Sequence, residues 1–142
     1  MKKLSPEEFK EIYSKVPRLC VDLIIKSKEG ILLTKRSIPP YLGKWHLPGG
    51  TVLFGEIVQE SIQRISGREL GIGLDVKKFL GFMEFDDWKR GGQHAISLVF
   101  LCGLKPGKIF LNDEASELIL TKNEINNIIP THLEFLKKHN IL

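Results

Sequence analysis

The chain has 142 residues, a formal net charge of +4, 42% hydrophobic residues and 27% charged residues. These values are typical of one globular domain with a sizeable core, so we predict a single domain over residues 1–142. The small, dispersed charge excess argues against a nucleic-acid partner but fits an anionic small molecule. No apolar run approaches the roughly 18 residues of a membrane span, and the basic start Met1-Lys2-Lys3 lacks the apolar segment of a signal peptide. We therefore predict a cytoplasmic protein without a membrane partner.

The two cysteines are also consistent with a cytoplasmic protein. Cys20 and Cys102 both lie in apolar runs that have the pattern of buried strands. Disulfides are rare in the reducing cytosol. We predict two buried free thiols rather than a disulfide.

The first predicted element is an N-terminal helix over about residues 5–16. Ser5 can cap the helix, Pro6 fits its first position, and Glu8 completes a capping box with Ser5. Pro17 ends the helix, because proline cannot continue the backbone hydrogen bonds of a helical turn.

Strands and helices alternate through the rest of the chain. Apolar runs of strand length are separated by Gly- and Pro-rich turns, and two longer stretches have helical periodicity. The predicted strands are residues 21–26, 31–33, 45–47, 74–85, 94–104 and 117–121, and the predicted helices are residues 56–70 and 130–139. This order predicts a mixed sheet covered by helices on both faces, an α/β sandwich.

The helix at residues 56–70 has an apolar side and a charged pair. We expect its buried side to contain Ile57, Val58, Ile62 and Ile65. Glu56 and Arg64 are eight positions apart, slightly more than two turns, so they share a face and can form an ion pair that fixes the preceding loop. Taken alone, a Glu–Arg pair on a helix more often marks a solvent-exposed face than a functional site.

Candidate oxygen ligands for a metal ion lie before this helix and near its C-terminal end. The carbonyl of Gly49 can approach a cation because no Cβ shields it, and Glu69 lies toward the other end of the helix. Mg²⁺ prefers oxygen ligands and usually shares the phosphates of its substrate. The pattern predicts half of a site for a metal-bound diphosphate.

The segment Gly50–Ile72, GTVLFGEIVQESIQRISGRELGI, resembles the Nudix box. The resemblance is carried by Gly50, Glu56, Arg64 and the closing Glu-Leu-Gly-Ile at their family spacings. It implies a Nudix-type α/β/α sandwich and a hydrolase of nucleoside diphosphates linked to another group. The family pattern has glutamates where this chain has Ile65, Arg68 and Glu69, so one of the three glutamates is kept.

The box is most similar to that of GDP-mannose mannosyl hydrolases, a Nudix branch that also lacks two glutamates. Further shared features are Pro17 after the first helix, Val21-Asp22, Lys35-Arg36-Ser37, Gly43-Lys44-Trp45 and Gln93-His94. In that branch water attacks the sugar carbon and the nucleoside diphosphate leaves, helped by one Mg²⁺ and arginines. The resemblance implies that Gly49 and Glu69 bind Mg²⁺ and that the protein is a homodimer. It also implies that Arg36 and Arg64 offset charge on the diphosphate, and that Asp22 contacts the substrate.

Two departures from the branch affect the remaining assignments. Thr51 stands where the branch has an arginine after the paired glycines. The branch also has a metal-binding Gln followed by a basic His before its last strand, and these positions align with Glu114 and Ala115. Glu114 is therefore our candidate metal ligand. Glu117, the nearest remaining carboxylate, is our candidate general base, with a structural role as the alternative.

Two residues near the polar loop 86–92 are further candidates for substrate binding. Trp88 can stack on a base or sugar, or cover the edge of the core. His94 can reach the diphosphate, or support the start of a strand.

The predicted function is Mg²⁺-dependent hydrolysis of a nucleoside diphosphate sugar or a related derivative. Cleavage of the pyrophosphate bond is the close alternative. A binding protein that has kept the pocket but lost turnover is the alternative from another class, motivated by the missing glutamates and histidine. The joint presence of Gly49, Glu69, Arg36 and Arg64 favours the enzyme. The residues leave open the sugar, the base and the bond that is cleaved.

Overall fold

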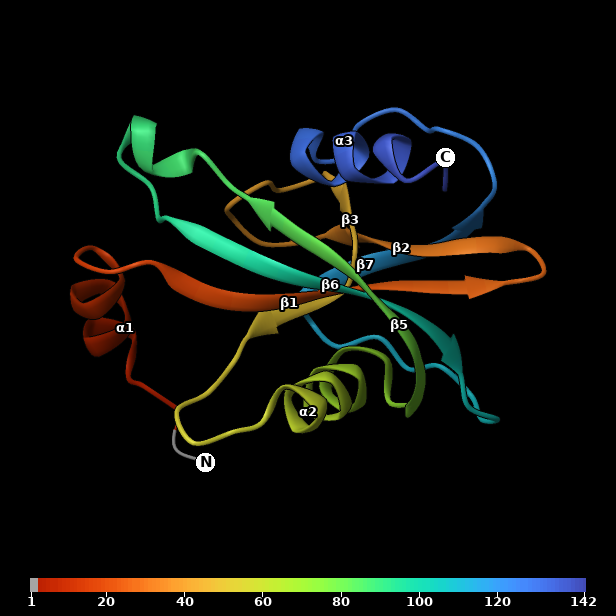
Figure 1. Cartoon of the computed structure of the whole chain (residues 1–142), viewed down its shortest axis with the longest axis horizontal. Coiled ribbons are helices and arrows are strands. Elements are labelled where there is room, and N and C mark those ends of the chain that lie inside the picture. The colour runs from red at the N-terminus through yellow and green to blue at the C-terminus, as the bar shows by residue number, and fades with distance from the viewer. Residues whose placement is uncertain (1–2) are drawn as a thin grey trace.

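The computed structural model describes residues 3–142, and its elements follow the predicted alternation (Figure 1). In chain order they are α1 (Pro6–Tyr13), β1 (Arg18–Ser27), β2 (Gly30–Arg36), β3 (Trp45–His46), β4 (Gly49–Thr51), α2 (Val58–Leu70), β5 (Leu74–Glu84), the 3₁₀ helix η1 (Asp87–Arg90), β6 (Ala95–Leu104), β7 (Ala115–Thr121) and α3 (Pro130–Lys138). Among the described residues, no helix is long and apolar enough to cross a membrane.

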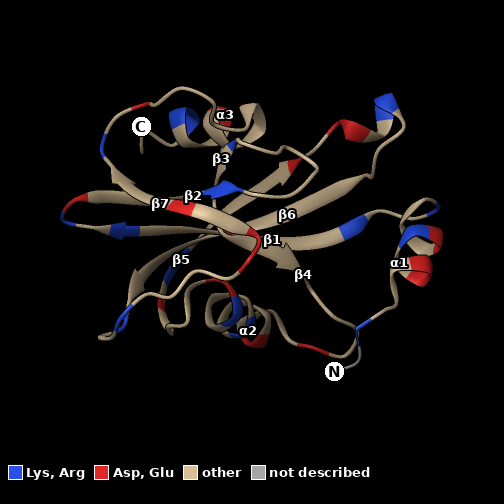
Figure 2. Cartoon of the chain, turned by 180° about the vertical axis from the view of Figure 1, so that it is seen from behind, with Lys and Arg blue, Asp and Glu red and all other residues tan. Residues whose placement is uncertain are grey.

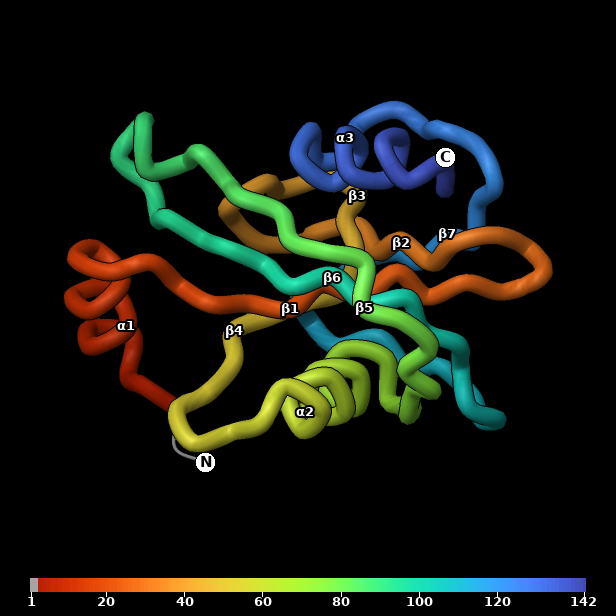
Figure 3. Tube along the Cα trace, viewed as in Figure 1, coloured from red at the N-terminus to blue at the C-terminus, as the bar shows by residue number. Residues whose placement is uncertain are grey.

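The long strand β1 organises a mixed sheet. It pairs in parallel with β6 and antiparallel with β4 and β2, while β5 continues the sheet beyond β6. Strand β2 also pairs with β3 and β7. Helix α2 covers one face and α3 the opposite face (Figure 1), and the trace in Figure 3 shows β4 leading from β1 toward α2. The predicted α/β/α sandwich with a mixed sheet is therefore confirmed.

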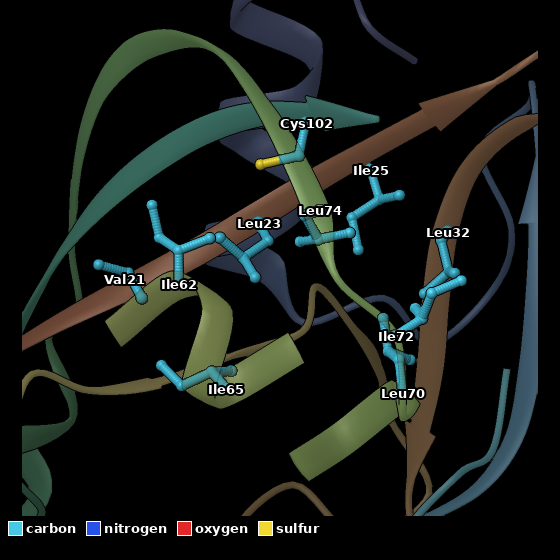
Figure 4. Packing of buried hydrophobic residues seen from close by; sticks show 10 residues of the cluster. All are labelled: Val21, Leu23, Ile25, Leu32, Ile62, Ile65, Leu70, Ile72, Leu74 and Cys102. Atoms are coloured by element: carbon cyan, nitrogen blue, oxygen red, sulfur yellow. The ribbon is translucent and has the colours of Figure 1, made fainter. Parts of the chain in front are cut away.

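Side chains of β1 alternate between two cores. Val21, Leu23 and Ile25 pack on the face covered by α2, together with Ile62 and Ile65 (Figure 4). Ile24 belongs to the cluster on the α3 face. Since successive side chains of a strand point to opposite faces, Asp22 shares the α3 face with Ile24. The alternation thus places a carboxylate, only 7% exposed, inside an otherwise apolar strand.

Helix α1 begins as predicted and ends early. The Ser5 hydroxyl accepts the Glu8 amide at 3.2 Å, and the Glu8 carboxylate accepts the Ser5 amide at 3.2 Å, which completes the capping box. Regular helix stops at Tyr13, and a turn carries the chain to Pro17. None of its residues is buried, so α1 rests against the domain instead of forming part of the core.

Helix α2 starts later than the sequence predicts, and one expectation about it is wrong. Regular helix begins at Val58, and Ile57 precedes it with an extended backbone (φ −76°, ψ 154°). Because Ile57 lies outside the helical periodicity, its side chain is 63% exposed instead of buried. The Glu60 carboxylate accepts the Ile57 amide at 3.2 Å and caps the helix. Ile62 and Ile65 are fully buried, as expected.

Both cysteines are buried and free, as predicted. Burial raises the pKa of both thiols to about 11, so they remain protonated at neutral pH.

Candidate functional site

A cleft of about 1200 Å³ opens at the end of the sheet where α1 and η1 lie. Its walls come from α1, the loop 37–44, β4, α2 and the segment before β7. It is lined by six of the residues that the sequence predicts for the site: Asp22, Arg36, Gly49, Arg64, Glu69 and Glu114. Residues separated by about 90 positions in the chain therefore meet in one cleft.

Two carboxylates form the acidic end of this cleft. Glu69, whose side chain is 13% exposed, lies on α2, and Glu114 lies in the segment before β7. The Arg68 guanidinium lies between them, with Nη2 3.7 Å from Glu69 Oε1 and 3.5 Å from Glu114 Oε2. In the described part of the chain, Glu69 Oε2 is buried without a hydrogen-bond partner. A buried oxygen of this kind requires a cation or a water.

Burial raises the pKa of Glu69 to about 7, and the negative charge of Glu114 adds to the rise. Arg68, the Gly49 amide and Arg36 act in the opposite direction. A divalent cation at Glu69 would oppose the effect of burial and keep the carboxylate ionised.

The donor set fits a hard cation that is only partly surrounded by protein. No group of three or more His, Cys, Asp or Glu side chains suited to a metal ion occurs within residues 3–142. Glu69, Glu114 and the carbonyl of Gly49 are oxygen donors that line the same cleft. Mg²⁺ commonly binds one or two carboxylates and completes its shell with water and substrate phosphates. The unpartnered oxygen of Glu69 agrees with that requirement.

Gly49 lies against Asp22, its partner in the pairing of β4 with β1. A Cβ at Gly49 would lie 2.3 Å from Asp22 Oδ1 and 2.5 Å from the Val21 carbonyl oxygen. The second contact is with backbone, which cannot rotate away. The glycine therefore allows β4 to approach the Asp22 carboxylate.

We expect Gly49→Ala to lower the free energy of unfolding by about 3 kcal/mol, the upper part of the range for overpacking. Gly67→Ala is the matched control, because a Cβ at Gly67 meets nothing within 4 Å. Urea unfolding measures both effects. Equal stabilities for the two variants would contradict the close approach of Gly49 to Asp22.

Asp22 is held by polar groups from two other elements. The Ser97 hydroxyl of β6 donates to Asp22 Oδ2, and His132 Nε2 of α3 lies 3.8 Å from Oδ1. The Leu47 amide donates to His132 Nδ1 at 3.0 Å, so the neutral ring carries its proton on Nε2, facing Asp22. Burial lowers the pKa of His132 to about 3 and raises that of Asp22 to about 7. The cleft thus contains an oriented carboxylate that titrates near neutral pH.

Arg64 holds the loop that precedes α2. Its Nε donates to Glu56 Oε2 at 2.7 Å, and its Nη2 donates to the Thr51 carbonyl at 2.7 Å. Glu56 also accepts the Leu53 amide at 3.0 Å, and its pKa is lowered to about 2, chiefly by the hydrogen bond from Arg64. The predicted Glu56–Arg64 ion pair is therefore present, and it connects both ends of the loop 51–56.

Arg36 enters the cleft from the end of β2. Its Nε donates to the Pro40 carbonyl at 2.5 Å, which fixes the side chain against the loop 37–44. Burial lowers its pKa, while the negative charges of Glu114 and Glu69 raise it. The guanidinium therefore lies in the field of the two carboxylates at the acidic end.

Three predicted site residues do not line the cleft. Glu117 lies on β7, is 56% exposed and pairs with Lys35 at 3.1 Å. Trp88 and His94 contact each other with ring centroids 5.6 Å apart, and Trp88 is 51% exposed. For all three, the observed contacts correspond to the structural alternatives.

An aromatic and basic wall that no sequence pattern indicates lies on the α1 side of the cleft. Phe9 and Tyr13 of α1 form an edge-to-face pair with centroids 4.8 Å apart, and both line the cleft. The Arg18 guanidinium lies 5.6 Å from the Phe9 ring. Arg18 also donates to Thr51 Oγ1 and to Gln93 Oε1, each at 2.8 Å. Arg18 thus places a guanidinium beside Thr51.

The surface around the cleft has mixed charge. Figure 2 shows acidic and basic residues interspersed along the elements. Arg90 of η1 pairs with Asp86, with Nη2 2.8 Å from Oδ1, and with Asp87, with Nη2 3.4 Å from Oδ1. Mixed charge of this kind suits a small ligand better than a polyanion.

The fold and cleft match those of a known family. The sequence matches the family model of the NUDIX domain over residues 16–138. The chain therefore belongs to the NUDIX family. A MutT NUDIX hydrolase from Burkholderia pseudomallei has a similar structure, with a TM-score of 0.80 and 27% identity over 87% of this chain and 98% of that chain. The MutT protein from Methanosarcina mazei Go1 superposes with a TM-score of 0.79 at 23% identity, covering 89% of this chain and 94% of that one.

Two curated proteins are similar over part of their length. The ADP-ribose pyrophosphatase of Methanocaldococcus jannaschii is 39% identical over 101 residues, 71% of this chain and 59% of that protein. The low-salt glycan biosynthesis protein Agl8 of Haloferax volcanii is 34% identical over 82 residues, 58% of this chain and 53% of that protein. The matched regions thus cover little more than half of each relative.

Proposed function

We propose that the protein is a Mg²⁺-dependent hydrolase of a nucleoside diphosphate derivative, in the first place a nucleotide sugar such as GDP-mannose. The observation that carries this proposal is the buried, unpartnered oxygen of Glu69 beside Glu114 in the cleft. An acidic end suits a metal-bound diphosphate. The aromatic wall of Phe9 and Tyr13 on the α1 side suits a planar base.

The roles of the cleft residues follow from their positions. Glu69, Glu114 and the Gly49 carbonyl would hold the Mg²⁺, which when bound polarises the phosphoryl oxygens. Arg36 reaches the same end, and its planar fork can donate two hydrogen bonds to the diphosphate. Arg64 positions the loop 51–56 through its bonds to Glu56 and the Thr51 carbonyl.

For the general base we propose Asp22 instead of Glu117. A base must lie within hydrogen-bond reach of the attacking water, directly or through one other water. Asp22 lines the cleft and is oriented by Ser97 and His132, whereas Glu117 is paired with Lys35 outside it. Asp22 keeps its expected role as a substrate contact as well. We assign structural roles to Trp88 and His94.

We expect Phe9→Ala to raise KM by roughly tenfold with little change in kcat, because stacking on a base is worth about 1–3 kcal/mol in binding. The Phe9 ring belongs to α1, whereas Glu69 belongs to α2 and Glu114 to the segment before β7. We therefore expect Phe9 to stabilise the ground state and the transition state equally. Phe110→Ala is the matched control, since Phe110 is 62% exposed and does not line the cleft. A fall in kcat with unchanged KM would contradict the placement of the nucleobase against Phe9.

Cleavage of the pyrophosphate is the second candidate reaction, and the similarity to the ADP-ribose pyrophosphatase favours it. Incubation with GDP-mannose, other nucleotide sugars and ADP-ribose in H₂¹⁸O separates the two. Label in the free sugar indicates attack at carbon, and label in a phosphate indicates attack at phosphorus. Absence of turnover across the panel with Mg²⁺ or Mn²⁺ would refute the proposed enzyme and leave a binding protein.

We retain the homodimer as part of the proposal. Leu4, Ile12 and Val16, at and around α1, are 37%, 40% and 47% exposed. Such side chains suit an interface between two copies. Light scattering at micromolar protein concentration measures the mass in solution.

A further inference from the structure

Arg68 stands at a position where the Nudix box has a glutamate, and its guanidinium contacts both carboxylates of the acidic end. Nη2 lies 3.7 Å from Glu69 Oε1 and 3.5 Å from Glu114 Oε2. The substitution thus changes the charge at this position from −1 to +1. It also connects α2 to the segment before β7, since Glu114 belongs to that segment.

Before any metal binds, the Arg68 guanidinium is the positive charge that lies near both carboxylates. Glu69 is 13% exposed, so water screens it poorly, and its Oε2 has no protein partner in the described residues. Arg64 is engaged by Glu56 and the Thr51 carbonyl, and Arg36 is fixed against Pro40. Arg68 is therefore the guanidinium that contacts both acids.

We propose that Arg68 is a tethered cation that competes with a divalent metal ion for Glu69 and Glu114 and limits the site to one ion. The proposal rests on the metal site of the proposed function. Arg68 acts as a positioning residue: it holds the two carboxylates together in the metal-free protein and gives way when the ion binds. The Arg68 side chain is 37% exposed, so solvent is available to receive the displaced guanidinium.

Competition by a charge at this distance has a measurable size. A unit charge about 4 Å from a ligand near a protein surface changes binding by a few kcal/mol at most, and partial exposure reduces the effect. We expect Arg68→Gln to lower the dissociation constant for Mn²⁺ roughly tenfold with one ion still bound. Arg68→Glu restores the carboxylate of the family pattern, so we expect a second ion to bind.

The test is Mn²⁺ binding followed by electron paramagnetic resonance of the free ion, without substrate or turnover. Lys137→Gln is the matched control. Lys137 lies on α3, and its Nζ is 2.8 Å from Glu124 Oε2. The variant therefore also removes one positive charge from an ion pair, but Lys137 does not line the cleft. Arg68→Lys keeps the charge and is expected to bind Mn²⁺ with an affinity close to that of the wild type. Thermal unfolding in EDTA is the second readout: Arg68→Gln melts lower than both the wild type and Lys137→Gln, and Mn²⁺ removes the difference.

The outcomes separate this inference from the proposed function. Tighter Mn²⁺ binding in Arg68→Gln than in Lys137→Gln supports the inference, even if no nucleotide is hydrolysed and the proposed enzyme is refuted. If the Mn²⁺ dissociation constants of Arg68→Gln and Lys137→Gln lie within twofold of each other, the inference is overturned, even if hydrolysis is found. Absence of Mn²⁺ binding in every variant overturns it too.

Discussion

Glu69→Gln is expected to reduce kcat by about 10³-fold, because loss of a metal carboxylate removes several kcal/mol of charge stabilisation in the transition state. Glutamine keeps the size of the side chain but removes the charge that a hard cation requires. Steady-state kinetics over a series of Mg²⁺ concentrations measures the effect. The concentration of Mg²⁺ that gives half of the maximal rate is expected to rise as well.

The matched control for this prediction is Glu124→Gln, which removes an exposed carboxylate that pairs with Lys137. It changes the net charge by the same amount, and Glu124 does not line the cleft. We expect near wild-type kinetics. If Glu69→Gln retained both its Mg²⁺ requirement and its rate, the metal would have to bind elsewhere in the protein.

The fold could be predicted because its signals are local. Ser5, Pro6 and Glu8 specify the start of α1 through contacts within one turn, and the structure contains each of these contacts. The ion pair predicted between Glu56 and Arg64 is also present, although Glu56 lies in the loop before α2 and not on the helix as the spacing assumes. Ile57 is the exception, because the helix start depends on where the Glu60 carboxylate caps the backbone, and apolar periodicity does not report it.

The cleft residues indicated by the sequence come either from the box or, for Asp22, Arg36 and Glu114, from the resemblance to the mannosyl hydrolase branch. Gly49, Arg64 and Glu69 lie in or beside the box, and all three line the cleft. Arg18 and Phe9 belong to other elements and reach the cleft only through folding, so no spacing along the chain indicates them.

Glu117 shows that proximity in the sequence does not decide which residues share a site. The sequence predicts Glu117 as the base because it is the nearest remaining carboxylate to Glu114 and Ala115. Across β2 and β7, however, the register sets Glu117 opposite Lys35, and the two form an ion pair outside the cleft. His132, which faces Asp22 from α3, is 110 positions away from it and carries no local signal.

Asp22→Asn is expected to lower kcat by ~10²–10⁴-fold, the usual effect of removing a general base. The wild-type rate should rise with pH through about 7, because Asp22 must be ionised to accept a proton and burial raises its pKa to about 7. The variant should lose this dependence. Glu117→Gln is expected to change kcat much less. The reverse order of the two effects would return the role of base to Glu117.

Asp22→Asn is expected to lower kcat but to raise the free energy of unfolding. Burial raises the pKa of Asp22 from 3.8 to about 7, so between these values the folded state holds a proton that the unfolded state releases. The associated stability is fully present below the unfolded pKa and is lost as pH rises through about 7. A shift of this size corresponds to about 4 kcal/mol. Asparagine cannot ionise, so Asp22→Asn should gain stability relative to the wild type between pH 4 and pH 8.

Urea unfolding of both proteins at pH 4, 6 and 8 measures this difference. His46 and His132 also titrate over part of this range, because burial lowers their pKa values to about 4 and about 3. Both histidines are present in the wild type and the variant, so their own contributions cancel in the difference. The charges of Asp22 and Glu69 repel each other, so loss of the Asp22 charge makes Glu69 easier to ionise and changes the difference in the same direction. The free energy of unfolding of the variant relative to the wild type should therefore rise with pH and level off above about 7, where Asp22 is ionised in both states. A difference independent of pH would mean that folding leaves the pKa of Asp22 unchanged, and that Asp22 lacks the basicity assigned to it in the cleft.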